Sequence, residues 1–292
     1  MLRRGLVYLA TMVGIIVVIG IVSNIICALL GVDPGSGGIG SILLISAVMG
    51  FAGSLISLFM SKSMVKRSMG VRVIGAPQTQ DEQFLVNTIS MLAQKKGVQM
   101  PEVGIYDAQE MNAFATGWNR NQALVAVSSG LLRQMNQEEV SAVLGHEMSH
   151  VANGDMVTMS LVQGIVNTFV YALSYLAAAA LASRDRNSRG GSVMMQYAVR
   201  SVLQMCLGFL GTMVVMWFSR LREYRADAGS AEVLGNAAMI RALQALKQQS
   251  ASTQKPATVQ ALCIFGVSSA SELFMSHPPL DKRIAALSSH QN

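Results

Sequence analysis

The chain has 292 residues, of which 51% are hydrophobic and only 13% carry a charge, and its formal net charge is +6. Because ordinary soluble domains contain about 25% charged residues, this composition excludes a soluble globular protein and indicates a membrane protein. The Lys and Arg residues lie beside apolar segments, a pattern typical of membrane topology. The basic charge therefore predicts contact with a lipid bilayer and no nucleic-acid partner.

Residues 1–61 are predicted to form a transmembrane hairpin. Residues 5–32 and residues 34–61 contain no charged side chain, and each is longer than the roughly 20 residues that a membrane-spanning helix needs. A cleavable signal peptide would lead into soluble chain, whereas Asp33 and a short glycine-rich turn lead into a second apolar segment. Basic residues precede and follow the hairpin, which predicts that both of its ends are cytoplasmic. These basic residues are Arg3, Arg4, Lys62, Lys66 and Arg67.

The chain from residue 62 to residue 155 is predicted to form the first part of a cytoplasmic domain. A helix is expected from about residue 80, because Thr79 and Glu82 match a capping box and Gly97 suits a helix end. Three short β-prone runs follow, broken by Asn, Gly and polar residues, so a small sheet is expected before the next helix. The runs are residues 103–106, 113–116 and 123–127.

The next helix carries the motif His-Glu-Met-Ser-His, which begins at His146. Asn136 and Glu139 match a capping box at its start. Since positions i and i+4 share one face of a helix, His146 and His150 can direct ring nitrogens at one metal ion, and zinc suits such ligands. Glu147 is rotated out of this pair, where its carboxylate can take a proton from a water molecule beside the metal. By chance, an HExxH sequence is expected in fewer than about one chain in a hundred, which disfavours the alternative of two solvated histidines on a polar face.

Two further apolar segments are predicted to form a second transmembrane hairpin. Residues 156–183 and residues 201–219 lack charged side chains, and they are long enough, the second marginally, to cross a bilayer. Crossing would place the basic turn between them outside, against the preference for basic residues inside. Burial in a soluble domain would instead require protein cover on every face of an apolar hairpin. Because the first helices mostly set the orientation, we expect both segments to cross.

Glu223 is the best candidate for a third metal ligand. A zinc site of this type needs three protein ligands and leaves its fourth position to water. Asp227 follows one helical turn later on the same face, where it can orient a ligand histidine. Taken alone, this acid pair beside Arg222 and Arg225 is more typical of a solvated, salt-bridged face. Because the histidines and Glu223 must meet at one metal, the chain between them crosses the bilayer twice or not at all.

The order of these motifs resembles the membrane-bound M48 zinc endopeptidases over nearly the whole chain. The likeness is carried by the His146 to His150 helix, by Glu223 to Asp227, by Asn112-Ala113-Phe114 and by His277-Pro278-Pro279. The resemblance implies a zincin-like (gluzincin) catalytic domain. It also implies that one Zn²⁺ is bound by His146, His150 and Glu223.

The resemblance further implies roles for residues outside the metal motif. A strand with Asn112, Ala113 and Phe114 would hold an extended peptide by main-chain hydrogen bonds. His277 and Arg283 would lie near the metal and stabilise the oxyanion of the intermediate. From the sequence alone, the first three residues are an ordinary strand start, and a histidine immediately before a proline indicates a structural turn.

These patterns predict a mainly α membrane protein with four apolar transmembrane helices and a cytoplasmic zincin-like catalytic domain that contains a small β-sheet. The domain would be assembled from residues 62–155 and 220–292, which flank the second hairpin, residues 156–219. Glu147 would be the general base in peptide-bond hydrolysis. The resemblance implies polypeptide substrates, in particular misfolded membrane proteins, and a place in the bacterial inner membrane.

Three alternatives differ from this interpretation in a recognisable way. An M48 relative that trims prenylated tails would share the same motifs. An intramembrane metalloprotease would place HExxH within an apolar span, but Gln137, Glu138 and Glu139 draw this helix toward water. A membrane scaffold with a structural zinc site would offer four protein ligands and no neighbouring base, whereas this chain offers three ligands and Glu147.

The predicted crossing of residues 156–219 can be tested by chemical labelling. In a variant that lacks Cys27, Cys206 and Cys263, Ser188→Cys becomes the only thiol. We expect a membrane-impermeant maleimide to label it in intact cells, because Ser188 lies in the turn that two crossings place in the periplasm. Labelling that requires broken cells would show that the segments turn back without crossing.

Overall fold

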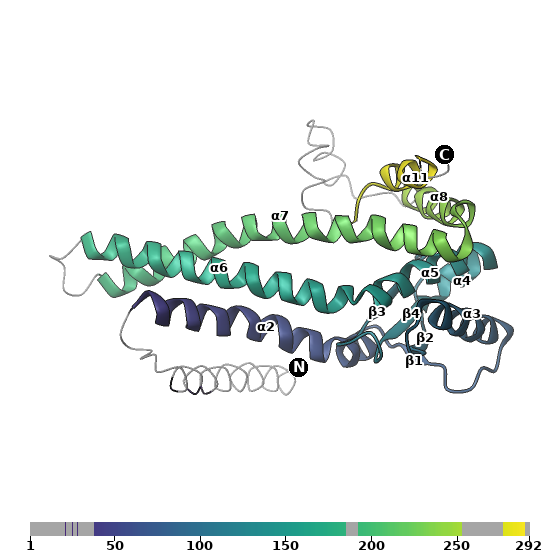
Figure 1. The fold of residues 1–292 in the computed structure, drawn as a ribbon, viewed down its shortest axis with the longest axis horizontal. Coiled ribbons are helices and arrows are strands. Elements are labelled where there is room, and N and C mark those ends of the chain that lie inside the picture. The colour runs from purple at the N-terminus through teal and green to yellow at the C-terminus, as the bar shows by residue number, and fades with distance from the viewer. Residues whose placement is uncertain are drawn as a thin grey trace. The chain divides into compact units, whose positions relative to one another are not determined.

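The computed structural model describes residues 21, 25, 28, 38–184, 192–252 and 277–289 of the chain. The described chain is mainly helical, with one small sheet (Figure 1). It divides into two compact units. One, the apolar unit, contains residues 1–56 and 160–215, and the other, the mixed unit, contains residues 57–159 and 216–292.

Three long helices supply the apolar unit: α2 (Ile39–Ser68), α6 (Asp155–Arg184) and α7 (Ser192–Leu234). By length and composition, each contains a stretch that is apolar enough to cross a membrane. Within the unit, α2 and α6 pack closely at Gly50, which has no side chain. A Cβ atom at this position would lie only 2.5 Å from Thr168 Oγ1. The first predicted span, residues 5–32, lies outside the described residues apart from Ile21, Ile25 and Ala28. A fourth membrane helix therefore stays a prediction.

Helix α7 is longer than the sequence patterns suggest. Separate helices were expected for residues 201–219 and for the segment with Glu223, but α7 continues without a break to Leu234. No Gly or Pro lies between Trp217 and Glu223, so neither of the residues that most strongly end a helix interrupts α7 here. The third ligand candidate and the apolar stretch therefore share one helix.

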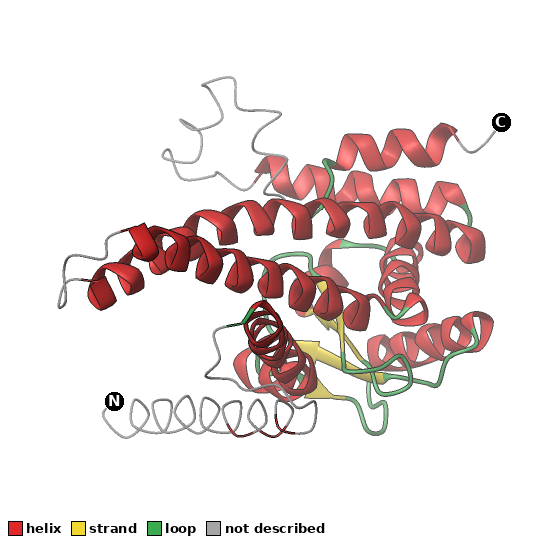
Figure 2. Cartoon of the chain, turned by 60° about the vertical axis from the view of Figure 1, so that its left-hand side comes forward, coloured by secondary structure: helices red, strands yellow, loops and turns green. Residues whose placement is uncertain are grey.

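The mixed unit contains a small sheet, drawn in yellow in Figure 2. Its four strands have the order β1-β2-β4-β3. The strands are β1 (Arg72–Val73), β2 (Glu102–Tyr106), β3 (Ala113–Thr116) and β4 (Leu124–Ser128). The β2–β4 pair is parallel, and the β1–β2 and β3–β4 pairs are antiparallel. Three of these strands are confirmed to within one residue, but the two-residue β1 was not predicted. Strand β4 is completely buried, whereas β3 forms one edge of the sheet.

Two helices of the mixed unit have the predicted ends. In α3 (Gln80–Lys96), the Thr79 side chain accepts a hydrogen bond from the Glu82 N–H, and Gly97 closes the helix with φ 65°. In α5 (Gln137–Asn153), Asn136 and Glu139 form both hydrogen bonds of a capping box. A short helix, α4 (Ser129–Gln134), joins the sheet to α5. These caps fix where α5 starts, and thereby which residues its buried face presents.

Helices α8 (Asn236–Ser252) and α11 (Leu280–Ser289) complete the mixed unit. The core of the unit joins buried side chains of α3, α5 and α8 with those of β4. Helix α5 also comes close to α7 at small residues: a Cβ atom on Gly145 would lie 2.5 Å from Ser230 Oγ. That hydroxyl donates a hydrogen bond of 2.7 Å to the Ala142 carbonyl. This close approach lets side chains on α5 and α7 meet.

Candidate functional site

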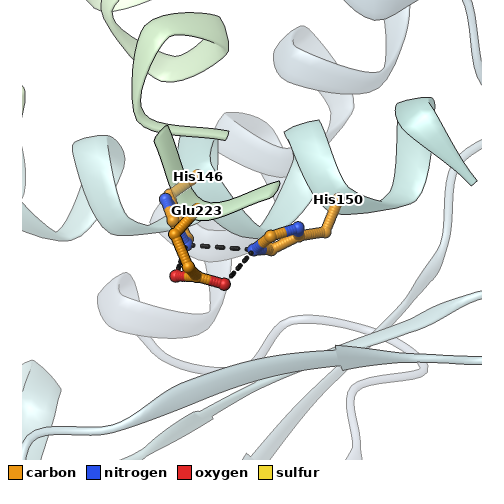
Figure 3. A group of neighbouring side chains, drawn as sticks. All are labelled: His146, His150 and Glu223. Carbon is orange, nitrogen blue, oxygen red and sulfur yellow. Dashed lines mark hydrogen bonds and ion pairs between the residues drawn. The ribbon is translucent and has the colours of Figure 1, made fainter. Parts of the chain in front are cut away.

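Three side chains from α5 and α7 converge in the mixed unit (Figure 3). His146 and His150 lie one turn apart on α5, with their Nε2 atoms 3.1 Å apart. Glu223 on α7 faces both rings, with Oε2 at 3.4 Å from His146 Nε2 and Oε1 at 3.3 Å from His150 Nε2. Glu223 is only 1% exposed. The three predicted metal ligands are thus brought together.

The separations of these donor atoms fit a small metal ion. With metal–ligand distances of about 2.0–2.2 Å, two ligands of a tetrahedral site lie about 3.3 Å apart. The three separations of 3.1, 3.3 and 3.4 Å agree with that value. Imidazole and carboxylate are donors that zinc and its neighbours in the first transition row accept. The residues present therefore fit a divalent metal ion.

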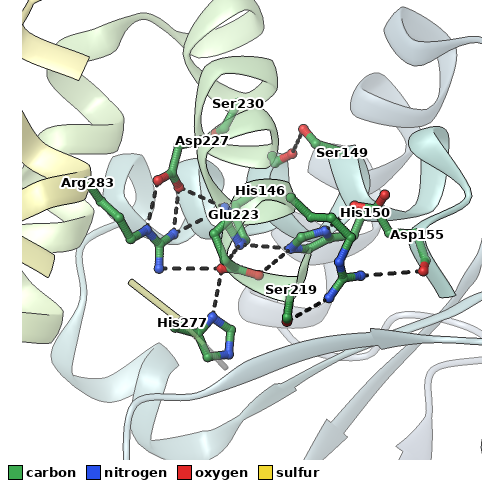
Figure 4. Close-up of polar contacts among 12 residues, drawn as sticks. His146, Ser149, His150, Asp155, Ser219, Glu223, Asp227, Ser230, His277 and Arg283 are labelled. Atoms are coloured by element: carbon green, nitrogen blue, oxygen red, sulfur yellow. Dashed lines mark hydrogen bonds and ion pairs between the residues drawn. The ribbon is translucent and has the colours of Figure 1, made fainter. Parts of the chain in front are cut away.

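Carboxylates contact the Nδ1 atoms of both histidines, on the side of each ring that faces away from Glu223 (Figure 4). His146 Nδ1 lies 2.9 Å from Asp227 Oδ1, and His150 Nδ1 lies 2.6 Å from Asp155 Oδ2. A proton on Nδ1 donates to the carboxylate and leaves the Nε2 lone pair free to bind metal. Both carboxylates thus set the tautomer and the ring orientation that a ligand needs.

Asp155 is a site residue that the sequence analysis missed. It is the first residue of α6 and is 3% exposed. Arg222 on α7 donates to its backbone carbonyl at 3.4 Å. Asp155 is the only charged residue between His150 and the uncharged segment that begins at residue 156. That isolated acid, close in sequence to a ligand, was the available signal.

Arg283 on α11 is buried against Asp227. Its Nε donates to Asp227 Oδ2 at 2.7 Å and its Nη2 donates to Oδ1 at 2.6 Å. The third nitrogen, Nη1, lies 3.6 Å from Glu223 Oε2. A bidentate pair of this kind fixes the plane of the carboxylate. Arg283 therefore fixes Asp227, which in turn holds His146.

His277 precedes α11 and contacts the carboxylate of Glu223, which also faces His146 and His150. Its Nδ1 lies 2.7 Å from Glu223 Oε2, while 62% of its side chain is exposed. The structure thus brings His277 to the metal group and leaves much of its ring open to solvent. The turn at Pro278 and Pro279 directs it there.

Burial and charge shift the protonation of the site. Burial lowers the pKa of His150, but the carboxylates of Asp155 and Glu223 outweigh it and raise that pKa to about 9. The pKa of His146 is also raised, since Asp227 and Glu223 oppose the effect of burial. Burial raises the pKa of Glu147. The group of carboxylates therefore favours a bound cation, whether a proton or a metal ion that displaces it.

A cavity of about 490 Å³ opens beside these residues. Glu147, His277 and Arg283 line it together with His146, and so do Asn112 and Ala113 at the start of β3. Its apolar part is formed by side chains of α4, α5 and α8, among them Leu131, Val143, Met239 and Leu246. The third residue of the predicted substrate strand, Phe114, is not part of this lining and packs on Tyr106, with ring centroids 5.5 Å apart. The cavity can accept an apolar side chain next to the carboxylate of Glu147 and next to the candidate metal ligand His146.

Comparison with known proteins identifies the family. The chain matches Peptidase family M48 over residues 79–291. It belongs to this family. It is 49% identical to Protease HtpX of Vibrio atlanticus, with 98% of this chain and 99% of that protein covered. It is 50% identical to Protease HtpX of Tolumonas auensis, again with 98% of this chain and 99% of the relative covered.

A solved structure agrees with the fold of this M48 peptidase. The crystal structure of S. mikatae Ste24p matches it with a TM-score of 0.64 at 19% sequence identity. The match covers 84% of this chain and 58% of Ste24p. At this identity the likeness shows the fold alone. Together with the family and the apolar helices, the comparisons identify a membrane-bound metalloprotease that acts on polypeptides, as the sequence predicted.

The role of Asp155 can be tested by metal binding without any activity measurement. We expect Asp155→Asn to lower metal affinity about 10 to 100-fold, because a neutral amide holds the proton on His150 Nδ1 less firmly than a carboxylate does. Affinity is measured on metal-free protein by competition with a fluorescent chelator. Asp81→Asn, an exposed acid in the first turn of α3, is the matched control and should bind as the parent does. Equal affinities of the two variants would exclude the proposed role.

Proposed function

We propose that this M48 peptidase is a zinc endopeptidase of the bacterial inner membrane that cleaves damaged or misfolded membrane proteins. The observation that carries the proposal is the convergence of His146, His150 and Glu223 beside the cavity that Glu147 lines. These three ligands would leave one position of a tetrahedral ion to water, as in catalytic zinc sites. The donor types and their separations support zinc over Mg²⁺ or Ca²⁺, which prefer oxygen ligands.

In this proposal, Glu147 carries the proton in peptide hydrolysis. When bound, the metal supplies Lewis-acid chemistry, because it lowers the pKa of a water ligand and polarises the substrate carbonyl. The Glu147 carboxylate accepts a proton from the attacking water and then donates it to the leaving amine. Its partly buried position raises its pKa, which favours the second of these transfers.

His277 and Arg283 are proposed to stabilise the transition state. Arg283 belongs to α11, and His277 lies just before this helix. The exposed part of the His277 ring can donate to the oxyanion from beside Glu223. Two nitrogens of Arg283 are bound to Asp227, and the third, Nη1, is paired with Glu223 Oε2 at 3.6 Å, so a substrate would have to share Nη1 with Glu223. The main task that we assign to Arg283 is therefore to hold Asp227 against His146.

The outer edge of β3 is proposed to bind the substrate backbone. The Ser128 N–H donates to the Asn112 carbonyl at 2.9 Å. In an antiparallel pair such bonding residues alternate, so Asn112 and Phe114 direct their main-chain groups at β4. Ala113 and Ala115 then direct theirs at the outer edge, and no strand in the described part of the chain pairs with that edge. An extended peptide can add there as a further strand.

The topology that we propose has four membrane helices, namely the hairpin of residues 1–61 and that of residues 156–219. Residues 62–155 and 220–292 form the catalytic domain on the cytoplasmic side. Three apolar helices and the basic residues Lys62, Lys66 and Arg67 in the last turns of α2 support this arrangement. Because Glu223 and the apolar stretch of residues 201–219 share α7, the site is tied to the bilayer, which favours membrane proteins as substrates.

Glu147→Gln tests the proposed chemistry. We expect the variant to retain one zinc per chain and the parent's melting temperature, and to lose peptidase activity by several orders of magnitude, because the base and not a ligand is removed. Zinc is measured by elemental analysis and activity with casein and a membrane-protein substrate. Glu138→Gln, an exposed acid in the first turn of the same helix, serves as control. Near-normal turnover of Glu147→Gln would contradict the assigned role.

Ala115→Pro tests the substrate edge. Proline removes the N–H at a position where it faces outward, so we expect the sheet to remain stable and KM for peptides to rise while zinc content is unchanged. Phe114→Pro is the contrasting variant, because the N–H that it removes points at β4 and its loss should lower the melting temperature. Unchanged KM in a folded Ala115→Pro protein would exclude main-chain binding at this edge.

A further inference from the structure

The loop between β3 and β4 contacts the end of the apolar part of α2. Trp118 in this loop packs on Phe59 of α2, with ring centroids 5.8 Å apart and planes tilted by 45°. Both rings remain open to the surroundings, since Trp118 is 39% exposed and Phe59 is 58% exposed. This contact is therefore outside the core of the mixed unit.

The position of Phe59 along α2 defines a depth in the membrane. Phe59 lies three residues before Lys62, the first charged residue after the uncharged segment of residues 34–61. At 1.5 Å per residue, the two differ by about 5 Å along the helix axis. Phe59 thus occupies the last turn of the apolar segment, where hydrocarbon gives way to headgroups. Tryptophan is enriched at this level, because its ring is apolar and its N–H needs a polar partner.

Ion pairs fix the sheet against the same end of α2. Lys62 Nζ lies 2.9 Å from Glu102 Oε1, and Lys66 pairs with the other oxygen of this carboxylate at the start of β2. Lys62 also donates to the carbonyl of Gln122, near the end of the loop, at 3.5 Å. The loop is therefore held at a constant height on α2.

The two segments that carry the aromatic rings also carry exposed arginines. Arg120 in the loop and Arg67 on α2 are exposed, and neither forms an ion pair with any acid in the described parts of the chain. The loop and the end of α2 thus carry four basic groups, of which only Lys62 and Lys66 pair with the carboxylate of Glu102. Exposed aromatic rings on segments that also carry arginines without an acidic partner suit the surface of a membrane that contains anionic phospholipids.

We propose that residues 117–122 together with Phe59 form a membrane-interface anchor that binds anionic phospholipid headgroups. In the anchor, Trp118 inserts at the level of the glycerol groups, and Arg67 and Arg120 bind phosphate. The anchor lies at one end of β3, whose other end lines the cavity. It therefore sets the direction of the substrate edge relative to the bilayer. The proposal rests on the insertion of α2 in the membrane, which is part of the proposed function.

The chain offers a direct test, because Trp118 and Trp217 are its only tryptophans. In the full-length Trp217→Phe protein, reconstituted in phosphatidylcholine vesicles, Trp118 is the sole reporter. We expect lipids brominated high on the acyl chains to quench most of its fluorescence, and lipids brominated near the chain ends to quench less. Bromine on phosphatidylglycerol should quench more than bromine on phosphatidylcholine at the same fraction. In the Arg67→Gln, Arg120→Gln double variant this headgroup preference should disappear.

The complementary Trp118→Phe protein distinguishes failure of the proposed anchor from failure of the proposed membrane spans. Its reporter, Trp217, belongs to the apolar stretch of residues 201–219 on α7. Quenching of Trp217 without quenching of Trp118 would overturn the anchor and leave the membrane spans intact. Absence of quenching for both would overturn the spans and the anchor together. Quenching of Trp118 with no preference for phosphatidylglycerol would overturn the binding of anionic headgroups.

Discussion

The constraint on which the site depends is the burial of negative charge around two histidines. Burying unpaired charges costs several kcal/mol each, so such groups persist only when they are compensated. With both histidines neutral, four carboxylates and two guanidinium groups leave the site with a charge of −2, which one divalent cation cancels. The six groups are Glu147, Asp155, Glu223, Asp227, Arg222 and Arg283. Under the proposed function, a divalent metal would thus be the counter-ion for the buried carboxylates of α5, α6 and α7, as well as the reagent of the proposed chemistry.

The same charges connect the site to the apolar helices. Asp155 opens α6 and Glu223 belongs to α7, so two of the three long apolar helices each contribute a carboxylate that binds or orients a metal ligand. A metal that bridges α5 and α7 also closes a chain loop of more than 70 residues between His150 and Glu223. Under the proposed function, the metal site would therefore be complete only when α5, α6 and α7 are all in place.

Local physics explains which parts of this protein were predictable from sequence. The pairing of His146 with His150 follows from the helical repeat, and the start of α5 follows from the Asn136 capping box, so both needed only nearby residues. The strands were found because turn residues bound them. Strand β1 has only two residues and pairs with β2, so it is too short to show a local sequence pattern. The continuity of α7 was missed because a change from apolar to charged composition was interpreted as a helix boundary, although polarity alone does not end a helix.

Tertiary contacts account for the remaining differences at the site. Asp155 acts on His150 across the turn that Gly154 makes between α5 and α6, and only the path of that turn shows that its carboxylate meets Nδ1. Arg283 was assigned to the oxyanion by resemblance. Its partner, Asp227, lies 56 residues earlier. Neither spacing carries a periodic signal, because each depends on how whole helices pack.

The geometry of β3 bears on how such a protease would select its substrates. To add to the outer edge of β3, a peptide must offer main-chain N–H and C=O groups in an extended conformation. In an intact membrane helix these groups are bonded within the helix, and exposing them in hydrocarbon costs several kcal/mol for each group. Native helices are therefore protected, whatever their sequence, whereas unfolded segments that leave the bilayer can pair with β3. Under the proposed function, selectivity for damaged proteins needs no recognition sequence. It follows from the backbone hydrogen bonds within an intact helix, which keep its main-chain groups from pairing with β3.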